Sequence, residues 1–122
     1  MKSFYLTLIL LTFLTCGQKR KDDLSLIIKT TFLEKLSNAA ISIIDSDIVY
    51  DPSYFAIAYP NGDVPKDKGV CTDVVIRAYR KMGIDLQKNV HEDMKANFSV
   101  YPKNWGLKTT DRNIDHRRVP NL

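Results

Sequence analysis

The sequence predicts an α+β domain, and three patterns support this fold class. Apolar residues recur every three to four positions over residues 24–44, which is the spacing of an amphipathic helix. Two later stretches, 71–82 and 85–98, have the same spacing. Between them and the first helix, β-branched and aromatic residues gather in segments 48–50 and 54–59, as in short strands bounded by turns.

The chain begins with the pattern of an export signal over residues 1–15. Lys2 precedes an apolar run that is too short to span a bilayer stably. Cys16 and a charged stretch follow, and together they resemble a bacterial lipoprotein signal, in which the cysteine becomes the lipidated first residue of the mature chain. Thr15 and Phe13 depart from the usual residues of that signal, so an ordinary secretory signal with a chance cysteine is the alternative.

These features give an expected organisation of three parts. Residues 1–15 form a signal peptide, residues 16–23 a lipidated Cys16 with a polar tether, and residues 24–122 a single domain. We therefore expect an exported protein of the bacterial cell envelope, lipid-anchored to a membrane that faces the periplasm or the exterior. A disulfide between Cys16 and Cys71 is disfavoured, because acylation removes Cys16 from thiol chemistry.

The charge of the chain argues against a nucleic-acid partner. The formal net charge is +4, falling to +3 once Lys2 leaves with the signal, and the basic residues are dispersed among 14 acids. Contact with anionic wall polymers or lipid headgroups is compatible with this balance, as is an inert solvated surface. The sequence contains no internal repeat, phosphate-binding glycine loop or paired metal-ligand motif, so we expect neither a cofactor nor a metal.

Local signals delimit each element. Asp22 and Asp23 are placed to cap the first helix, whose apolar stripe we expect to lie in the core. The loop over residues 63–69 ends at Gly69, which we expect to adopt a backbone angle that other residues resist and so turn the chain into the next helix. Gly83 is typical of the residue after a helix end, and Asp85 of an N-cap.

The last stretch, residues 101–122, reads as irregular structure with Trp105 against the core. At its end, Val119 and Pro120 resemble the opening turn of a further helix, because proline is favoured at the first helical position.

Cys71 is the strongest candidate functional residue. It lies in the first turn of the helix over residues 71–82, where unpaired N–H groups and the positive end of the helix dipole favour a thiolate. The alternative is an ordinary small buried residue. Asp73, two residues on, has an acid's favoured place beside the dipole and reads first as structural, with substrate contact as the weaker option.

Several ordered blocks over residues 46–122 resemble a bacterial family, the domain-of-unknown-function family twelve eighty-seven. They are Tyr50–Tyr54, Tyr59–Pro65, Gly69–Arg80, Gly83–Gln87, His91–Met94 and Asn113–Leu122. That family in turn resembles papain-like, NlpC-type cysteine hydrolases of the cell wall. The resemblance implies the N-terminal helical part of a papain-like fold, with most of the antiparallel sheet missing, and Cys71 as nucleophile. It also implies a downstream histidine in a His-Ile-Gly segment, which this sequence does not contain, so the chain resembles a domain truncated at its C-terminus.

A thiol nucleophile needs a base, and the sequence offers two histidines. His116, in the irregular C-terminal stretch, is the candidate catalytic residue, because it can reach a site more freely, although neighbouring arginines lower an imidazole's pKa. Its alternative role is a structural anchor or a substrate contact. His91, beside Val90 on the second helix, is expected at the surface or in a second layer.

These observations predict a cysteine amidase or peptidase that acts on amide bonds of cell-wall peptide or glycopeptide, incomplete and weakly active or inactive as given. Two other hypotheses remain: a non-catalytic envelope lipoprotein that binds cell-wall material, and a broken gene product without function. The oligomeric state is left open.

Overall fold

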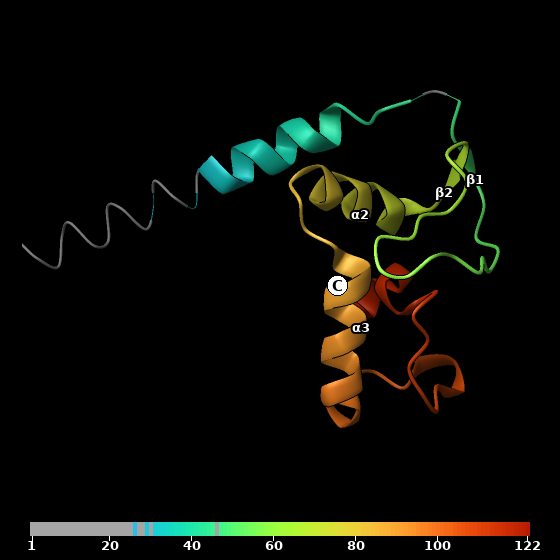
Figure 1. Ribbon diagram of the computed structural model, residues 1–122. Coiled ribbons are helices and arrows are strands. Elements are labelled where there is room, and N and C mark those ends of the chain that lie inside the picture. Colours follow the sequence, from blue (N-terminus) through green and yellow to red (C-terminus); the bar gives the residue numbers. More distant parts are fainter. Residues whose placement is uncertain (1–25, 27–28, 30, 46) are drawn as a thin grey trace, which may run out of the picture. The chain divides into compact units, whose positions relative to one another are not determined.

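The computed structural model describes residues 26, 29, 31–45 and 47–122, and the chain divides into two compact units, 1–35 and 36–122. The predicted signal peptide, Cys16 and the tether lie outside the described residues. Among the described helices, none is long and apolar enough to cross a membrane. The second unit combines two strands and two α-helices, labelled in Figure 1, with four short 3-10 helices named η1 to η4 and with residues 36–41 of the helix that precedes them; this confirms the α+β class.

Residues 31–41 are helical, which confirms the described part of the helix predicted over 24–44. A turn at residues 42–43 ends it before the predicted boundary. Its stripe residues Phe32, Leu36 and Ala40 are half-buried, and Leu33 and Ile41 are exposed. The described part of the stripe is therefore only partly covered by other residues.

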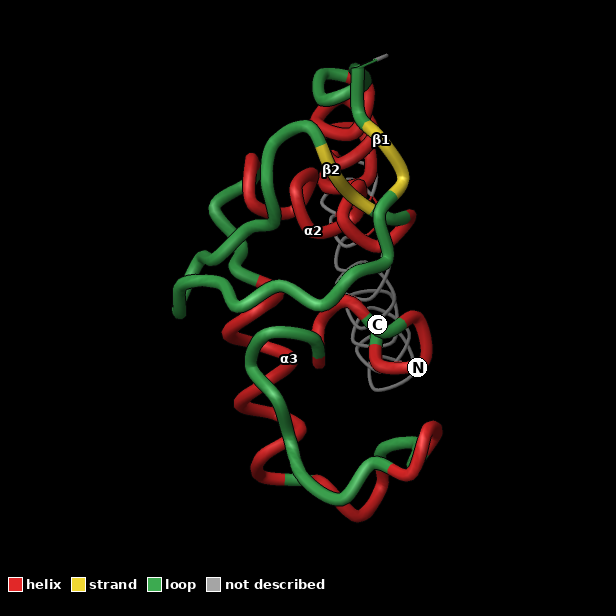
Figure 2. The backbone as a smooth tube through the Cα atoms, turned by 90° about the vertical axis from the view of Figure 1, so that its right-hand side faces the viewer, coloured by secondary structure: helices red, strands yellow, loops and turns green. Residues whose placement is uncertain are grey.

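The two strands form a parallel pair, seen in Figure 2. Strand β1, Val49–Tyr50, pairs in the register Val49 with Lys68 and Tyr50 with Gly69, which are the two residues of β2, Lys68–Gly69. The sequence does not predict this pair, because its signals place residues 63–69 in a loop. Parallel pairing is possible because the connection over residues 51–67 is long enough to carry the chain back to the same end of the sheet.

Segment 54–59, predicted as extended, forms no strand. Its backbone groups bond to side chains instead of a ladder: the Ile57 N–H donates to Asn113 Oδ1 at 3.1 Å, and the Ala58 carbonyl accepts from Gln87 Nε2 at 2.8 Å. Gly69 also differs from prediction, because it does not adopt a positive φ angle and lies in β2, where its carbonyl accepts from the Asp51 N–H.

Helix α2, Cys71–Lys81, starts one residue after β2. The Asp73 carboxylate accepts the Val70 N–H at 2.7 Å and so caps the first turn. At the other end Gly83 has a φ of 79°, and its N–H bonds to the Arg80 carbonyl. The predicted helix and its terminating glycine are both confirmed.

Helix α3, Leu86–Ala96, is capped by Asp85, whose Oδ1 accepts the Lys88 N–H at 3.2 Å, as predicted. The helix ends before Phe98, which instead begins η1, Phe98–Val100. The remaining chain contains η2, Asn104–Gly106, η3, Asp115–Arg117, and η4, Val119–Asn121. The predicted helical turn at Pro120 is present as η4.

Polar side chains make up much of the core. Among the described residues, the buried apolar side chains are Val64, Ile76, Ala78 and Met94, whereas six buried side chains are polar or charged: Thr72, Asp73, Gln87, Asp115, His116 and Arg117. Three of these six belong to η3, the segment that contacts both α2 and α3 (Figure 1). Hydrogen bonds and an ion pair therefore fix the C-terminal segment against the two helices.

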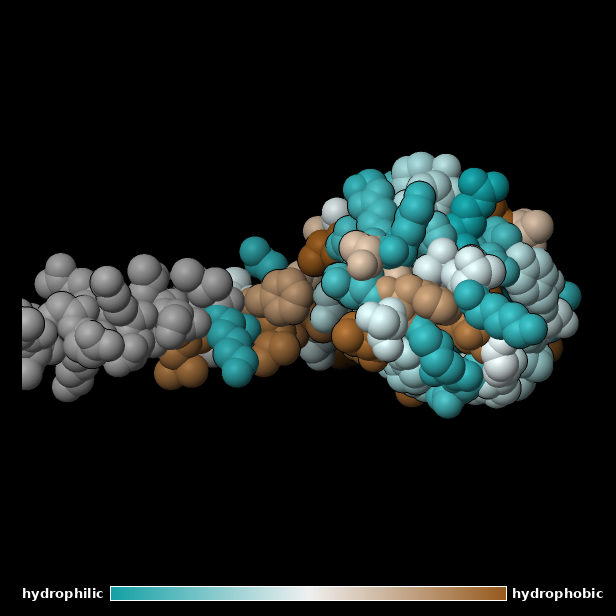
Figure 3. All heavy atoms as spheres, turned by 90° about the horizontal axis from the view of Figure 1, so that it is seen from below, coloured by the Kyte–Doolittle hydropathy of each residue, from teal (hydrophilic) through white to brown (hydrophobic). Residues whose placement is uncertain are grey.

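Trp105 does not pack against the core as predicted, because its side chain is 74% exposed. Its φ of 58° and the φ of 68° at Gly106 turn the chain sharply here and leave the indole at the surface. Figure 3 shows one face of the molecule, on which hydrophilic residues are interspersed with hydrophobic ones.

Candidate functional site

Cys71 carries a free thiol on an exposed residue. It is the first residue of α2, so the sulfur lies beside the N–H groups and the positive dipole end of an eleven-residue helix. The alternative of a buried structural cysteine is not what the structure shows.

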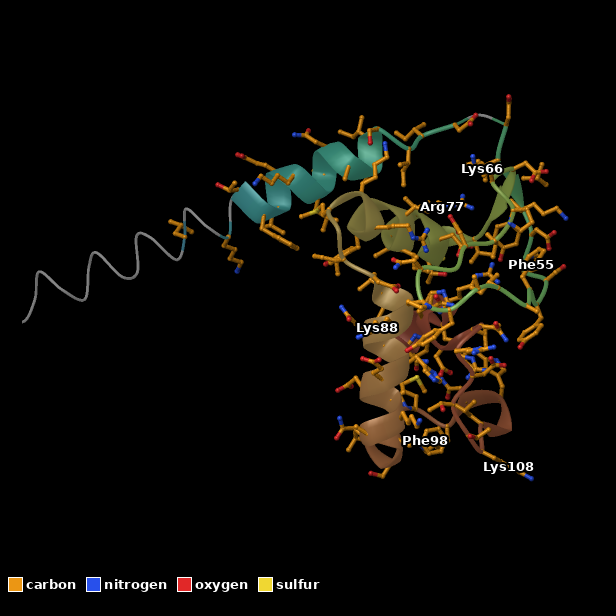
Figure 4. The ribbon with its side chains drawn as sticks, in the orientation of Figure 1. Phe55, Lys66, Arg77, Lys88, Phe98 and Lys108 are labelled. Atoms are coloured by element: carbon orange, nitrogen blue, oxygen red, sulfur yellow. The ribbon has the colours of Figure 1, made fainter. Side chains whose placement is uncertain are left out.

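The loop before Cys71 is held by Arg77 of α2, labelled in Figure 4. Its guanidinium donates to the carbonyls of Pro65 and Lys68 at 3.2 and 3.0 Å, and to Asp63 at 3.0 Å. The Arg77 side chain thus bonds to three residues of the loop that precedes Cys71. Because Arg77 belongs to the same helix as Cys71, it fixes this loop against the helix.

Cys71 lies at the wall of a cavity of about 610 Å³. Two arginines and an exposed tryptophan are the chemically distinctive members of a mostly apolar lining, which consists of Tyr50, Pro52, Val70, Cys71, Thr72, Asn104, Trp105, Ile114, Arg117, Arg118, Val119 and Pro120. A second cavity of about 220 Å³ shares Tyr50, Val70 and Cys71 with the first. Cys71 therefore borders two cavities.

The smaller cavity is lined by aliphatic side chains, including Ile43, Ile48 and Val74, and by the charged residues Asp73 and Arg77. Its lining includes no histidine. The two cavities next to Cys71 differ in charge, because the larger is lined by two arginines, whereas the smaller is lined by one acid and one arginine.

Arg117, one of the two arginines that line the larger cavity, has a structural role. Its Nε and Nη2 both bond to the Asp73 carboxylate at 3.0 Å, and Nη1 donates to the Ser53 carbonyl at 3.2 Å. Both side chains of the pair are only 3% exposed. Thr72 Oγ1 also donates to the Arg117 carbonyl. Asp73 therefore connects the first turn of α2, which contains Cys71, to η3, and its role is structural.

Arg118, the next residue, has much weaker partners. Its Nη1 lies 3.9 Å from Asp115 Oδ1, and the buried Nη1 atom donates to no acceptor among the described residues. Its guanidinium carbon lies 5.7 Å from the centre of the Trp105 ring. This cation borders the cavity with its hydrogen-bonding capacity partly unused.

The structure does not bring His116 into either cavity that Cys71 lines. The residue is only 1% exposed, and its Nδ1 has no hydrogen-bond partner among the described residues. Burial is the main cause that lowers the pKa of His116 to about 4, and the Arg117 charge lowers it further, while Asp73 opposes the shift. At neutral pH the imidazole is therefore uncharged. His116, expected in an irregular stretch from which it could reach a site, is instead a core residue of η3, which agrees with its alternative role as a structural anchor.

His91 is also absent from both linings, and it forms a different pair. Its Nδ1 lies 3.0 Å from Oδ2 of the fully buried Asp115, and the same Oδ2 accepts the Asp111 N–H at 2.7 Å. The predicted second-layer position fits a side chain that is 17% exposed. The pair fixes α3 to η3.

The sequence did not single out Asp115 or Gln87, which are fully buried, or Arg118, which lines the larger cavity. Gln87 donates to the carbonyls of Ala58 and Arg112 and accepts the Gly62 N–H. No sequence pattern predicts that a single helical glutamine will form three hydrogen bonds to backbone groups. For a metal, the described part of the chain offers no group of three or more histidine, cysteine, aspartate or glutamate side chains.

The comparisons with known proteins bear on this site. The chain is 58% identical over 87 residues to the uncharacterized protein YijF of Escherichia coli strain K12, a match that covers 71% of this chain and 42% of that protein. It thus spans less than half the length of this relative. No solved structure matches the chain. The model of the domain of unknown function DUF1287 matches residues 37–122, which include Cys71, both cavities and η3, and the chain therefore belongs to the DUF1287 family.

Proposed function

We propose that this chain carries the nucleophilic part of a cysteine hydrolase that acts on amide bonds of cell-wall peptide or glycopeptide. The observation that carries the proposal is the exposed thiol at the first residue of α2, which borders two cavities at once. A thiol in that place is accessible to a peptide, and the helix start offers N–H groups to a developing oxyanion. The papain-like arrangement is part of the same proposal and is supported by the helix that follows β2 directly.

The proposed step begins with attack of the Cys71 sulfur on a carbonyl carbon. A carbon–sulfur bond forms, the thiol proton passes to a base, and the bond to the leaving group breaks. An amine leaves only when it is protonated, so amide cleavage needs an acid in the site. Neither cavity beside Cys71 is lined by a histidine of the described residues. We therefore infer that this chain is acylated readily only by a substrate whose leaving group needs no proton.

A comparison of an activated ester with an amide tests this proposal. The Cys16→Ser chain, which keeps Cys71 as its single thiol, is incubated with the p-nitrophenyl ester and, separately, the simple amide of the same acetylated peptide. Intact-protein mass spectrometry is expected to show one acyl group from the ester and none from the amide. The adduct is expected to disappear in Cys71→Ala. No acylation of the folded Cys71 chain, or equal acylation of Cys71→Ala, overturns the proposal.

The second candidate is a non-catalytic envelope lipoprotein that binds cell-wall material. The observation in its favour is the largely apolar cavity without a histidine in its lining. The two candidates differ in the effect of Cys71→Ala: retention on purified cell wall that survives this substitution, with no acylation of the original chain, supports the binding protein.

Export and lipid attachment at Cys16 belong to the proposal too. Fatty-acid label is expected on the chain expressed in bacteria and absent from Cys16→Ser. Equal labelling of the two chains, or none of either, contradicts the anchor.

A further inference from the structure

We propose that Arg118 and Trp105 form a carboxylate-binding subsite in the larger cavity, and that the amide attacked by Cys71 therefore belongs to an acidic peptide. The inference deepens the proposed function and rests on it for the position of the scissile bond. In this proposal Arg118 determines substrate specificity and takes no part in bond making or breaking.

The first support is the contrast between the two neighbouring arginines. Arg117 has its guanidinium satisfied by the Asp73 carboxylate and the Ser53 carbonyl. Arg118 Nη1 lies 3.9 Å from Asp115 Oδ1, which is beyond hydrogen-bond distance, and it donates to no acceptor in the part of the chain that the structure describes. The Asp115 carboxylate interacts with His91 and the Asp111 N–H through Oδ2, whereas its Oδ1, the atom nearest Arg118 Nη1, has no hydrogen-bond partner among the described residues. A carboxylate entering the cavity would meet a cation whose hydrogen-bonding capacity is not used up.

The second support is Trp105. A tryptophan that is 74% exposed gains little from burial, and its φ of 58° is uncommon for a bulky residue. Its ring lies 5.7 Å from the guanidinium carbon of Arg118, within the range of a cation–π contact. This contact places the Arg118 charge beside the exposed indole. A planar guanidinium can offer two parallel hydrogen bonds to a carboxylate, which a lysine cannot.

The third support is the common lining. Cys71, Trp105 and Arg118 border one cavity, whose other walls include Val119, Pro120 and Ile114. Apolar walls reduce the water around an ion pair and so strengthen it. One bound peptide can therefore place a carbonyl at the Cys71 sulfur and a carboxylate at Arg118.

Trp105 is the single tryptophan of the chain, so its fluorescence reports this subsite. The probe is acetylated alanyl-glutamate amide, titrated into a chain with Cys16→Ser and Cys71→Ser, so that binding is measured without chemistry. The matched neutral probe is acetylated alanyl-glutamine amide. The acidic peptide is expected to bind about tenfold more tightly, because hydrogen bonds between a guanidinium and a carboxylate are charge-assisted and those to a neutral amide are weaker.

Arg118→Gln is expected to remove this preference, and Arg118→Lys to retain part of it, because the charge stays while the planar fork is lost. The matched control is Arg112→Gln, which removes one positive charge from an exposed residue outside both cavity linings. Equal binding of the two peptides, an unchanged preference in Arg118→Gln, or an equal loss in Arg112→Gln overturns the subsite. Should Arg118→Gln fail to fold, the Arg118→Lys variant decides: a reduced preference for the acidic peptide supports the subsite, and an unchanged preference overturns it.

A second assay separates this inference from the proposed function. Iodoacetate and iodoacetamide both alkylate a thiol with loss of iodide, but only the first carries a carboxylate. The ratio of their rates at Cys71 is expected to fall about fivefold in Arg118→Gln, equivalent to roughly 1 kcal/mol, and to stay constant in Arg112→Gln. Failure of both reagents to modify the folded chain counts against the proposed function, whereas the peptide titration still decides the subsite.

Discussion

At the scale of single residues, the Asp73–Arg117 pair connects the candidate nucleophile to the rest of the fold. The carboxylate caps the turn that contains Cys71 and neutralises a guanidinium that is 3% exposed. Neither task can pass to water, because both side chains are buried. The two residues lie 44 positions apart, so the pair also closes a long stretch of chain.

Asp73→Asn is expected to lower the free energy of unfolding by about 3–5 kcal/mol, because it leaves a buried guanidinium without its counter-ion. Urea unfolding measures the effect. The matched control is Asp67→Asn on an exposed residue, with an expected change within about 0.5 kcal/mol. The double variant with Arg117→Gln should lose less than the sum of the single variants. Additive losses would show that the two side chains do not interact.

His116 gives the stability of the domain a pH dependence. Its pKa is lowered to about 4 in the folded chain from 6.5, chiefly by burial. The unfolded chain therefore takes up the proton first as pH falls, so stability decreases from about pH 6.5 down to about pH 4 and then levels off. Between pH 7 and pH 5 the loss due to this residue is expected to be about 2 kcal/mol.

Urea unfolding of the original chain and of His116→Asn, at pH 7 and pH 5, checks this expectation. The variant lacks the buried imidazole, so its stability should fall less between the two pH values. An identical decrease in both chains would contradict the assigned burial of a neutral His116.

At the scale of elements, Gln87 connects α3 to two loops. It is fully buried, donates to the Ala58 and Arg112 carbonyls and accepts the Gly62 N–H. Gly62 itself leaves no room for a side chain, because a Cβ there would overlap the Ala58 carbonyl oxygen. The loop over residues 58–62 is thus held by its backbone.

Gln87→Leu preserves approximate size but leaves three backbone groups without their partner, and we expect a loss of at least about 3 kcal/mol in the free energy of unfolding. Lys88→Gln is the control, since Lys88 forms a solvent-exposed pair with Glu92 and should change stability by less than about 0.5 kcal/mol. Thermal and urea unfolding of both variants measure the difference. Similar stabilities of the two would contradict the structural role of Gln87.

Gly62→Ala tests the same loop from its other side. The added methyl group cannot fit without displacing the backbone of Ala58, so a marked loss of stability is expected. Gly83→Ala serves as comparison: nothing lies within 4 Å of a Cβ there, and only the φ of 79° opposes it, at a cost of about 1–2 kcal/mol. A smaller loss for Gly62→Ala than for Gly83→Ala would argue against the close approach.

The elements also show where sequence patterns succeed. Helices α2 and α3 were predictable because their signals are local: Asp85 and Gly83 act within a few residues of themselves. The parallel pairing of β1 with β2 was not, since it depends on where the chain returns after residues 51–67. The same holds for segment 54–59, whose partner Asn113 lies 56 positions away from Ile57.

For the candidate site, the position of Cys71 at a helix start was predictable from the apolar spacing of the residues that follow it and from the resemblance to DUF1287. The surroundings of the thiol were not. They come from the C-terminal stretch, whose irregular backbone has no periodic pattern, and from side chains such as Trp105 and His116, whose exposure is set by contacts distant in sequence. A tryptophan is by default a core residue, and here the strained turn reverses that default.

At the scale of the whole molecule, the chain combines a domain fixed by buried polar contacts with an accessible thiol. Residues 37–122 belong to the DUF1287 family, and the chain is 58% identical over 87 residues to a longer relative. The activity proposed for the domain depends on one property that can be measured on this chain as it is: the nucleophilicity of Cys71 in the folded state.

The most direct test compares alkylation of Cys71 by iodoacetamide in the folded and the urea-unfolded Cys16→Ser chain at the same pH. The exposed thiol borders N–H groups and the positive helix end only when folded, so we predict faster alkylation of the folded chain. A free cysteine measured in both solvents corrects for the effect of urea. Slower alkylation of the folded chain than of the unfolded chain would contradict a nucleophilic Cys71.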